Sequence, residues 1–191
     1  MKKYILPSIK LTAVFTVILC ILYPLLISFA AKLSKGEGNG EKVILNDKAV
    51  GYKLIGQSFT APQYFWGRPS AVGYNAAGSA GSNKGPTNAD YLKEVSNRID
   101  TLLKYHPTLQ KNEIPAEMVT ASGSGLDPNI SVRGAEIQAK RIAAYRHLPL
   151  SKVLKLIATH TEEPLLGLFG PEKVNVLALN IALDKLLKKP I

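Results

Sequence analysis

The longest apolar stretch of the chain runs from residue 11 to residue 31 and carries no charged side chain. A helix rises about 1.5 Å per residue, so a helix of this length spans about 30 Å, the thickness of the hydrocarbon core of a bilayer. No other stretch of the sequence approaches this length without a charge. The pattern therefore predicts a single transmembrane helix at 11–31, preceded by a basic N-terminal tail at 1–10.

The basic residues that flank the predicted span indicate its orientation. Lys2, Lys3 and Lys10 precede the span, and Lys32 and Lys35 follow it. Lys and Arg close to a span favour the cytoplasmic side of the membrane. The count therefore predicts, by a small margin, that the N-terminus lies inside and the rest of the chain outside.

A cleaved signal peptide is the alternative to a retained anchor, since residues 28–30 form the small-x-small triplet that signal peptidase reads. The apolar stretch is longer than the roughly 7–15 residues of a signal-peptide core, which favours an anchor. Within the span, Thr12, Thr16 and Pro24 are unusual for a helix that faces lipid everywhere. They indicate packing against other membrane helices or, for the hydroxyls, hydrogen bonds back to their own helix, and both readings stay open.

Beyond the span, the pattern predicts a linker and one domain. Residues 32–48 are typical of a flexible linker because glycine alternates with polar residues at 34–40. Residues 49–191 are enough for one extramembrane domain with its own core. This domain begins with a predicted strand at 50–59, and the stretch 60–86 then shows no period, although its aromatic residues argue against disorder.

The remainder of the domain alternates helical patterns with short strands. In chain order, the predicted elements are a helix that begins at the capping-box sequence 87–90 and ends before His106, a strand at 117–121, a helix capped by Ser131 that reaches His147, a helix capped by Ser151, a strand at 174–179, and a closing helix from Asn180 to 188–190. This order predicts an α/β or α+β domain with a small sheet and about four helices.

Charge narrows the choice of partners. The chain carries a formal net charge of +10, and the domain without the three N-terminal lysines has 21 basic and 14 acidic residues. Its lysines are scattered, which is typical of a solvated surface or of one that meets anionic lipid or an acidic protein rather than nucleic acid. The one cysteine, Cys20, lies in the apolar stretch, so no intramolecular disulfide forms.

Motifs for catalysis and for metal binding are absent from the sequence. No Gly-Lys dipeptide occurs, which excludes a Walker A loop, and no Gly-x-Gly-x-x-Gly or Asp-Lys-Thr-Gly-Thr occurs either. Residues 121–125 lack the first glycine of a nucleophile elbow, and the three histidines lack the spacing of metal ligands. The residues themselves therefore predict no catalytic group and no metal site.

Three segments taken together, in this order, are specific to one family. They are residues 64–71 (YFWGRPSA), 119–128 (VTASGSGLDP) and 174–180 (VNVLALN). With them, the chain resembles the C subunit of the Kdp-type potassium-transporting ATPase over nearly its whole length. The predicted N-terminal span lies where that family has its one membrane helix.

This resemblance implies a non-catalytic subunit of an ATP-driven, high-affinity potassium uptake complex in the bacterial cytoplasmic (inner) membrane. Its partners would be a channel-like subunit that carries the ion, a P-type ATPase subunit that hydrolyses ATP, and a small single-span subunit. The family's C subunit is described as needed for assembly and as a catalytic chaperone that raises the ATP affinity of the ATPase subunit. No cofactor is expected on this chain alone, and ATP would be met only through the complex.

Two groups of residues are candidates for contacts outside the chain. The resemblance likens one loop to the signature loop of ABC ATPases, which makes a weak nucleotide candidate of Ser122, Gly123, Ser124, Gly125 and Asp127. The aromatic and Asn-rich loop is the leading candidate for a partner interface, because Trp, Tyr and Arg dominate binding hot spots. Its candidate residues are Tyr64, Phe65, Trp66, Arg68, Tyr74, Asn75, Ser82, Asn83 and Asn88.

Each interface candidate also has a purely structural reading. Trp66 could fill the core of its own domain, with Arg68 tied to backbone carbonyls, and the Asn and Ser residues could serve turns and caps. Two other functions stay open at this stage. One is a membrane-anchored envelope enzyme, although no acid/base pair supports it, and the other is an anchored adaptor that binds anionic lipid.

Overall fold

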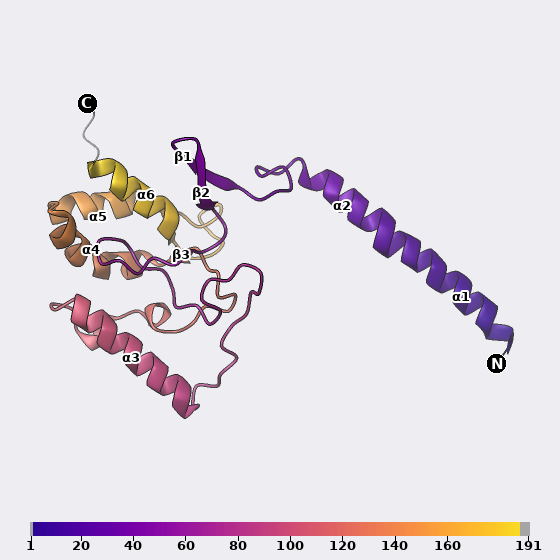
Figure 1. Cartoon of the computed structure of the whole chain (residues 1–191), viewed down its shortest axis with the longest axis horizontal. Helices are drawn as coiled ribbons and strands as arrows, with labels where there is room; N and C mark the ends of the chain where they lie inside the picture. The colour runs from indigo at the N-terminus through magenta and orange to yellow at the C-terminus, as the bar shows by residue number, and fades with distance from the viewer. Residues whose placement is uncertain (1, 188–191) are drawn as a thin grey trace. The chain divides into compact units, whose positions relative to one another are not determined.

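The computed structural model describes the backbone of residues 2–187 and the side chains of residues 3–186. The chain divides into two compact units, one up to Val50 and the other from Gly51 onward. The first unit holds the apolar helix and most of a small hairpin, and the second holds the helices of the domain (Figure 1).

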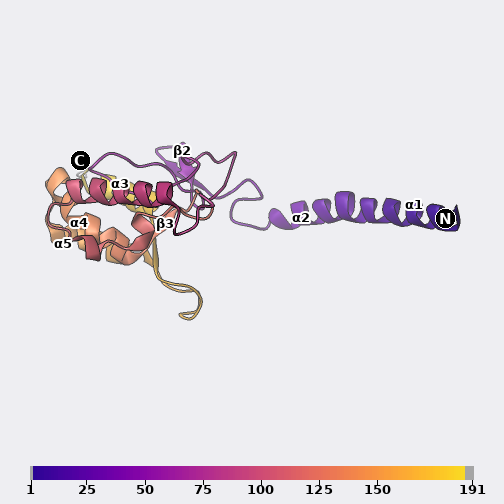
Figure 2. The same ribbon diagram turned by 90° about the horizontal axis from the view of Figure 1, so that it is seen from below.

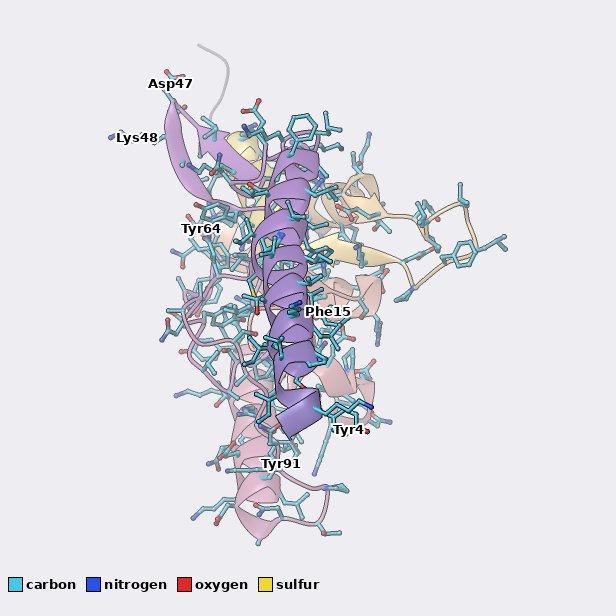
Figure 3. All side chains as sticks on the ribbon, turned by 90° about the vertical axis from the view of Figure 1, so that its right-hand side faces the viewer. Tyr4, Phe15, Asp47, Lys48, Tyr64 and Tyr91 are labelled. Carbon is cyan, nitrogen blue, oxygen red and sulfur yellow. The ribbon has the colours of Figure 1, made fainter. Side chains whose placement is uncertain are left out.

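The N-terminal helix is continuous and apolar. It consists of α1 (Lys2–Thr16), a π-helical segment η1 (Val17–Leu22) and α2 (Tyr23–Ala31). Residues 3–31 are long and apolar enough to cross a bilayer, and none of their surface is buried by the protein. Tyr4 and Phe15 point outward from the helix (Figure 3). The predicted helix is confirmed, and it begins nine residues before the predicted span at residue 11.

The π-helical segment has a local cause in Pro24. Proline has no N–H, and its ring crowds the carbonyl four residues earlier, here that of Cys20. The N–H of Tyr23 reaches back five residues to Ile18 O, which widens the turn just before the proline. Thr12 and Thr16 lie one turn apart on the exposed surface of α1, and their packing against other membrane helices stays a prediction.

A hairpin follows the helix, formed by β1 (Lys42–Leu45) and β2 (Lys48–Tyr52). Asn46 and Asp47 both have positive φ, which is the geometry of a type I′ turn, and Asp47 and Lys48 stand at its tip (Figure 3). The prediction of a strand at 50–59 is therefore wrong beyond Tyr52. The first strand lies inside the segment predicted as a linker, where its four residues are too short to show a clear alternation.

A second sheet lies in the domain, with β5 (Lys173–Asn175) between β3 (Asn129–Ile130) and β4 (Thr161–Glu162), all antiparallel. The apolar run 174–179 was predicted to be one strand, but the chain leaves the sheet after Asn175 and turns directly into a helix. Short apolar runs fit a buried strand and a buried helix equally well, so the periodicity of 174–179 does not distinguish a strand from a helix.

Four helices build the body of the domain. They are α3 (Ala89–Tyr105), α4 (Val132–Arg146), α5 (Leu150–Thr159) and α6 (Val176–Leu187). Helix α4 packs on α5, and α5 packs on α6, with β5 against both α4 and α6. The predicted fold class, one N-terminal helix followed by a small domain with little sheet and four helices, is confirmed. The predicted end of the last helix at 188–190 lies outside the described residues.

The helix ends show which capping predictions hold. The Ser131 side chain accepts the N–H of Gly134 at 2.9 Å, and the helix that it caps ends at Arg146 with His147 in the left-handed region. Asn88, one residue after the predicted start, caps α3, and this helix ends before His106 as predicted. The predicted cap at Ser151 is wrong, because α5 begins at Leu150 after Pro149 and has no side-chain cap.

Between α3 and α4 the chain forms two short 3₁₀ helices, η2 (Lys111–Glu113) and η3 (Ala116–Met118). The strand predicted at 117–121 is therefore wrong. Met118 and Val119 are buried, which explains the apolar pattern of that segment, but the N–H groups of both bond locally, to Pro115 O and Ala116 O, rather than to a neighbouring strand.

The long segment between β2 and α3 contains no helix or strand, and part of it crosses the core. Phe65 in this segment is fully buried among side chains of the helices and of β5. Figure 1 shows the segment passing between α3 and the other helices. An extended segment in a core needs partners for its backbone N–H and C=O groups, because an unpaired buried group is costly.

Two buried amide side chains supply these partners. The side chain of Asn180 on α6 accepts the N–H of Phe65 at 2.8 Å and donates to its C=O at 3.0 Å. The side chain of Gln138 on α4 does the same for Trp66, at 2.8 and 3.1 Å. Both amides are at most 2% exposed. Each therefore acts as a short piece of neighbouring strand, and together they hold the segment between two helices.

We expect Asn180→Leu to lower the free energy of unfolding by about 2–5 kcal/mol, because it leaves two buried backbone groups of Phe65 without partners. Urea unfolding of the purified full chain in detergent measures this, followed by the fluorescence of Trp66, the one tryptophan of the chain. The matched control is Asn97→Leu on the exposed surface of α3. An equal midpoint for wild type and Asn180→Leu would contradict the prediction.

Candidate functional site

Trp66 occupies the centre of the candidate site, between α3 and α4. The guanidinium group of Arg141 on α4 lies 4.1 Å from the centroid of the indole ring. Tyr105 and His106 meet the ring edge-on, with centroids 5.2 and 5.9 Å away. The indole N–H donates to Ala61 O at 3.0 Å. Trp66 therefore joins three parts of the domain and, half-buried, packs against its core.

Arg141 is a buried cation, only 4% exposed, that is held by neutral acceptors. Its Nη2 donates to Tyr64 O at 3.0 Å and to Gln138 Oε1 at 2.8 Å, and Nη1 donates to Pro62 O. Burial lowers the pKa of Arg141 to about 10, which leaves it charged at neutral pH. A buried charge is tolerated where hydrogen bonds and an aromatic face replace water, as they do here.

His106 completes the arrangement as a neutral ring. Its Nε2 accepts a hydrogen bond from Arg141 Nε at 2.9 Å, so the proton sits on Nδ1, which donates to Leu102 O at 2.7 Å. Burial lowers the pKa of His106, and the Arg141 charge lowers it further, against the opposing effect of the Leu102 bond. A second proton would place two positive charges 2.9 Å apart.

A second cluster fixes Tyr64, at the entry to the buried segment. The Tyr64 hydroxyl donates to Asp184 Oδ2 at 3.1 Å, and the Arg146 guanidinium lies 4.6 Å from the Tyr64 ring centroid. Arg146 forms an ion pair with Asp184 at 2.8 Å and donates from Nε to Gln63 O at 2.9 Å. The segment is thereby held by hydrogen bonds to charged as well as amide side chains of α4 and α6, and the ion pair joins the two helices to each other.

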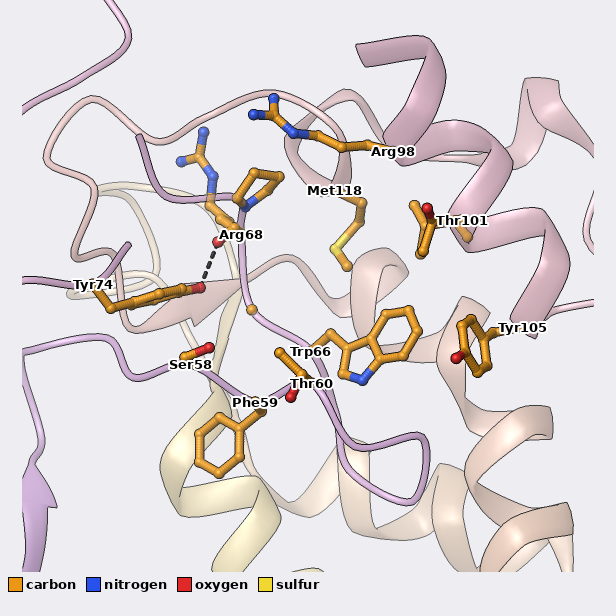
Figure 4. A pocket seen from close by; sticks show the side chains of 13 residues that line it. Ser58, Phe59, Thr60, Trp66, Arg68, Tyr74, Arg98, Thr101, Tyr105 and Met118 are labelled. Atoms are coloured by element: carbon orange, nitrogen blue, oxygen red, sulfur yellow. Dashed lines mark hydrogen bonds between the residues drawn. The ribbon is translucent and has the colours of Figure 1, made fainter. Parts of the chain in front are cut away.

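The two most distinctive sequence motifs contact each other. Arg68 forms an ion pair with Asp127 at 2.9 Å, and the Ser70 hydroxyl donates to Gly125 O at 2.7 Å. The Tyr74 hydroxyl donates to Arg68 O, as the dashed line in Figure 4 shows. Burial raises the pKa of this Tyr74 hydroxyl, so it remains a donor at neutral pH. Segments 64–71 and 119–128 are therefore parts of one structure.

Further hydrogen bonds join residues 69–80 to the 119–128 segment. The N–H of Ser122 donates to Pro69 O at 3.0 Å, and the Ser79 hydroxyl donates to Ser124 O at 2.9 Å. Gly125 has a φ of +68°, and a Cβ there would lie 2.7 Å from Ala80 O. Glycine at this position is required both by the left-handed backbone and by the approach of the other loop.

A pocket of about 430 Å³ opens beside Trp66, and we call it the Trp66 pocket. Its apolar walls come mainly from Phe59, Trp66, Leu102, Tyr105 and Met118, and the guanidinium groups of Arg68 and Arg98 lie together on one side (Figure 4). Both guanidinium groups already have acidic partners, Asp127 and Glu94. Among residues 2–187, no three His, Cys, Asp or Glu side chains are placed to hold a metal ion.

Comparison with known proteins decides the family. Residues 5–185 match the family model described as "K+-transporting ATPase, c chain". The chain belongs to this family.

Curated relatives named "Potassium-transporting ATPase KdpC subunit" align over nearly their whole length. The protein of Flavobacterium johnsoniae is 56% identical over 96% of this chain and 99% of its own, and that of Bacteroides fragilis is 52% identical over 96% and 98%. The Polaromonas naphthalenivorans protein is 47% identical over 100% and 98%.

The residues predicted to form a partner interface differ in burial, and they lie both in the core and on the surface of the domain. Phe65 is fully buried, so it is a core residue and is not available to a partner, which corrects its place among the candidates. Tyr64, Trp66 and Arg68 are half-buried and bonded within the domain. Tyr74, half-buried, lines the pocket together with Trp66 and Arg68.

The Asn and Ser candidates mostly serve local structure. The Asn75 side chain accepts the N–H of Ala77 at 3.0 Å, and the Asn88 side chain caps α3 at Tyr91 N. Asn83 is exposed and has a positive φ, and Ser82 is half-buried. A role of these residues in partner contact stays a prediction.

Sequence reasoning missed Arg141, gave no role in the site to His106 or Gln138, and used Asn180 only as the start of a helix that in fact begins at Val176. A signal for Arg141 was present, because it directly precedes Ile142 in the apolar stripe of the predicted helix at 132–147. A charged residue next to the buried face of a helix is almost never fully buried unless it is paired. Apart from Gln138, three residues away, the hydrogen-bond partners of Arg141 lie 35 to 79 residues away along the chain, which no local pattern reveals.

We expect the stability of the domain to fall as the pH drops below about 6.5, the pKa of an unperturbed histidine. The pKa of His106 is lowered in the folded state, so between these two pKa values the unfolded chain binds the extra proton and unfolding becomes easier. Urea midpoints of the full chain in detergent, at pH 7.5 and 5.5, measure the loss. His106→Gln should lose less over the same range, and parallel losses in both proteins would contradict this assignment.

Proposed function

We propose that the chain is a non-catalytic subunit of an ATP-driven potassium uptake complex, needed for its assembly and for coupling between its subunits. The observation that carries the proposal is the match of nearly the whole chain to c chains of potassium-transporting ATPases. The structure supports a structural role, because polar groups of segments 64–71 and 119–128 form an ion pair and hydrogen bonds with each other. The subunits that we expect beside it are a channel-like subunit, a P-type ATPase subunit that hydrolyses ATP, and a small single-span subunit.

The apolar helix and the flanking lysines support a single-pass placement in the bacterial cytoplasmic membrane, with the N-terminus inside and the domain outside. In this orientation the domain cannot meet cytosolic ATP. It can still raise the ATP affinity of the ATPase subunit by preferring one conformation of its partners, since such coupling is reciprocal between sites. This would make the chain a chaperone of catalysis that binds no nucleotide itself.

Direct nucleotide contact through residues 122–127 is the alternative, and the geometry of the loop argues against it. A phosphate cradle needs several neighbouring N–H groups that point at one anion. Here the N–H groups of Ser122, Gly125 and Leu126 already bond to Pro69 O, Ser122 O and Ser124 Oγ. Asp127, a negative charge, is paired with Arg68 and bonds to the N–H of Asn129.

An affinity tag on this chain should recover a channel-like and a P-type ATPase subunit from detergent-solubilised membranes of the native host. Deletion of the chain should abolish growth at limiting potassium, and the purified chain alone should hydrolyse no ATP. An envelope enzyme or a lipid-binding adaptor predicts neither the co-purification nor the growth defect. Recovery of the tagged chain without these subunits would contradict the proposal.

The side of the membrane on which the domain lies distinguishes coupling through the partner subunits from direct contact with nucleotide. With Cys20 replaced by Ala, a single cysteine at Ser151, exposed on α5, should react with an impermeant maleimide in intact spheroplasts. A cysteine at Lys3 in the same background should react only after lysis. The reverse pattern would place the domain beside the ATPase subunit and make direct nucleotide contact the leading mechanism.

A further inference from the structure

The loop between β4 and β5, residues 163–172, is ordered but lies outside the core. Leu165 and Phe169 form a bridge with two backbone hydrogen bonds of 3.0 Å, so the tip is a small closed hairpin. Figure 2 shows this β4–β5 loop projecting away from the helices of the domain. The loop is therefore a structured protrusion rather than an irregular connection.

The tip of this loop is strongly apolar and exposed. Leu165, Leu166, Leu168 and Phe169 are 70%, 80%, 81% and 64% exposed. Single exposed apolar residues are ordinary, but four large ones on one tip form a patch of the kind that marks an interaction site. The described residues of the domain leave these four side chains largely uncovered.

The backbone of the tip presents these side chains outward. Leu166 has a φ of +56°, a left-handed conformation that is unfavourable for a residue with a Cβ. Gly167 and Gly170 also have positive φ, and a Cβ at either would meet nothing within 4 Å. A strained, open turn of this kind is typical of segments that contact a ligand or partner.

The charges at the base of the loop indicate what covers it. Glu163 and Glu172 flank the apolar tip and are exposed, while Glu162 is paired with Lys173 at 3.7 Å. This acidic collar would be repelled by an anionic lipid surface, which attracts basic flanks instead. It is complementary to a protein surface whose apolar pocket is bordered by Lys or Arg.

We propose that the β4–β5 loop inserts its Leu and Phe side chains into an apolar pocket, rimmed by basic side chains, on another subunit of the potassium-transporting complex. The inference rests on the proposed function, since it needs such a subunit. The Trp66 pocket of a second copy of this chain fits the loop less well. The two arginines beside its Trp66 pocket are already paired with Asp127 and Glu94, so the collar finds no unpaired cation there.

Photo-crosslinking tests which molecule the tip touches. With p-benzoylphenylalanine in place of Leu168, irradiation of the complex in membranes should attach this chain to one polytopic subunit, identified by mass spectrometry. An adduct with phospholipid only, with a second copy of this chain, or with nothing would overturn the proposal.

Matched variants test whether the contact holds the complex together. Leu168→Glu should lower recovery of the partner subunits by about tenfold or more, because an anchor residue of an interface is lost. Leu168→Met should retain them, and so should Leu92→Glu, which places the same charge on an exposed leucine of α3. The urea midpoint of Leu168→Glu, read from Trp66 fluorescence, should equal that of wild type.

Failure of the inference and failure of the proposed function give different results. If wild type and Leu168→Glu recover the partner subunits equally, the loop is not an anchor, although the chain still belongs to the complex. If wild type itself recovers none of them, both proposals are wrong. A lowered urea midpoint in Leu168→Glu would assign the loop to folding rather than docking.

Discussion

The domain depends on two buried amides that stand in for a missing strand. Phe65 and Trp66 lie in the core without joining either sheet, and Asn180 and Gln138 pair with their backbone groups. Each amide pairs with the backbone N–H and C=O of one residue, and the fully buried side chain of Phe65 sets which residue that is. The two sheets, of two and three short strands, can therefore be small without leaving the core undefined.

The buried cation of Arg141 adds the connection to α3. It bonds to the carbonyls of Pro62 and Tyr64, just ahead of Phe65. It also bonds to Gln138 and His106, and it covers the face of Trp66. One guanidinium group thus couples three parts of the chain that share no sheet. Removal of one such partner leaves others unpaired, so the cluster behaves as a unit rather than as a sum of separate contacts.

The sequence was sufficient for the apolar helix, the fold class, the Ser131 helix and the family, since each leaves a local or a specific pattern. It failed where an apolar run had no readable period, as at 117–121 and after Asn175, and where a residue's role depends on distant partners. Trp66 and Arg68 show this second limit. Tryptophan and arginine are common in binding surfaces. Here, however, Trp66 contacts Arg141 on α4 and Arg68 pairs with Asp127, so both side chains are engaged inside the domain.

The widened turn ahead of Pro24 has a consequence for the apolar helix. A π turn closes over five residues instead of four, so the residues after it are rotated relative to an uninterrupted α-helix. A stripe of side chains that faces one neighbour in α1 does not continue in line through α2. The two halves of the apolar helix thus present differently directed rows of side chains, so one straight neighbour could not follow the same row along both halves.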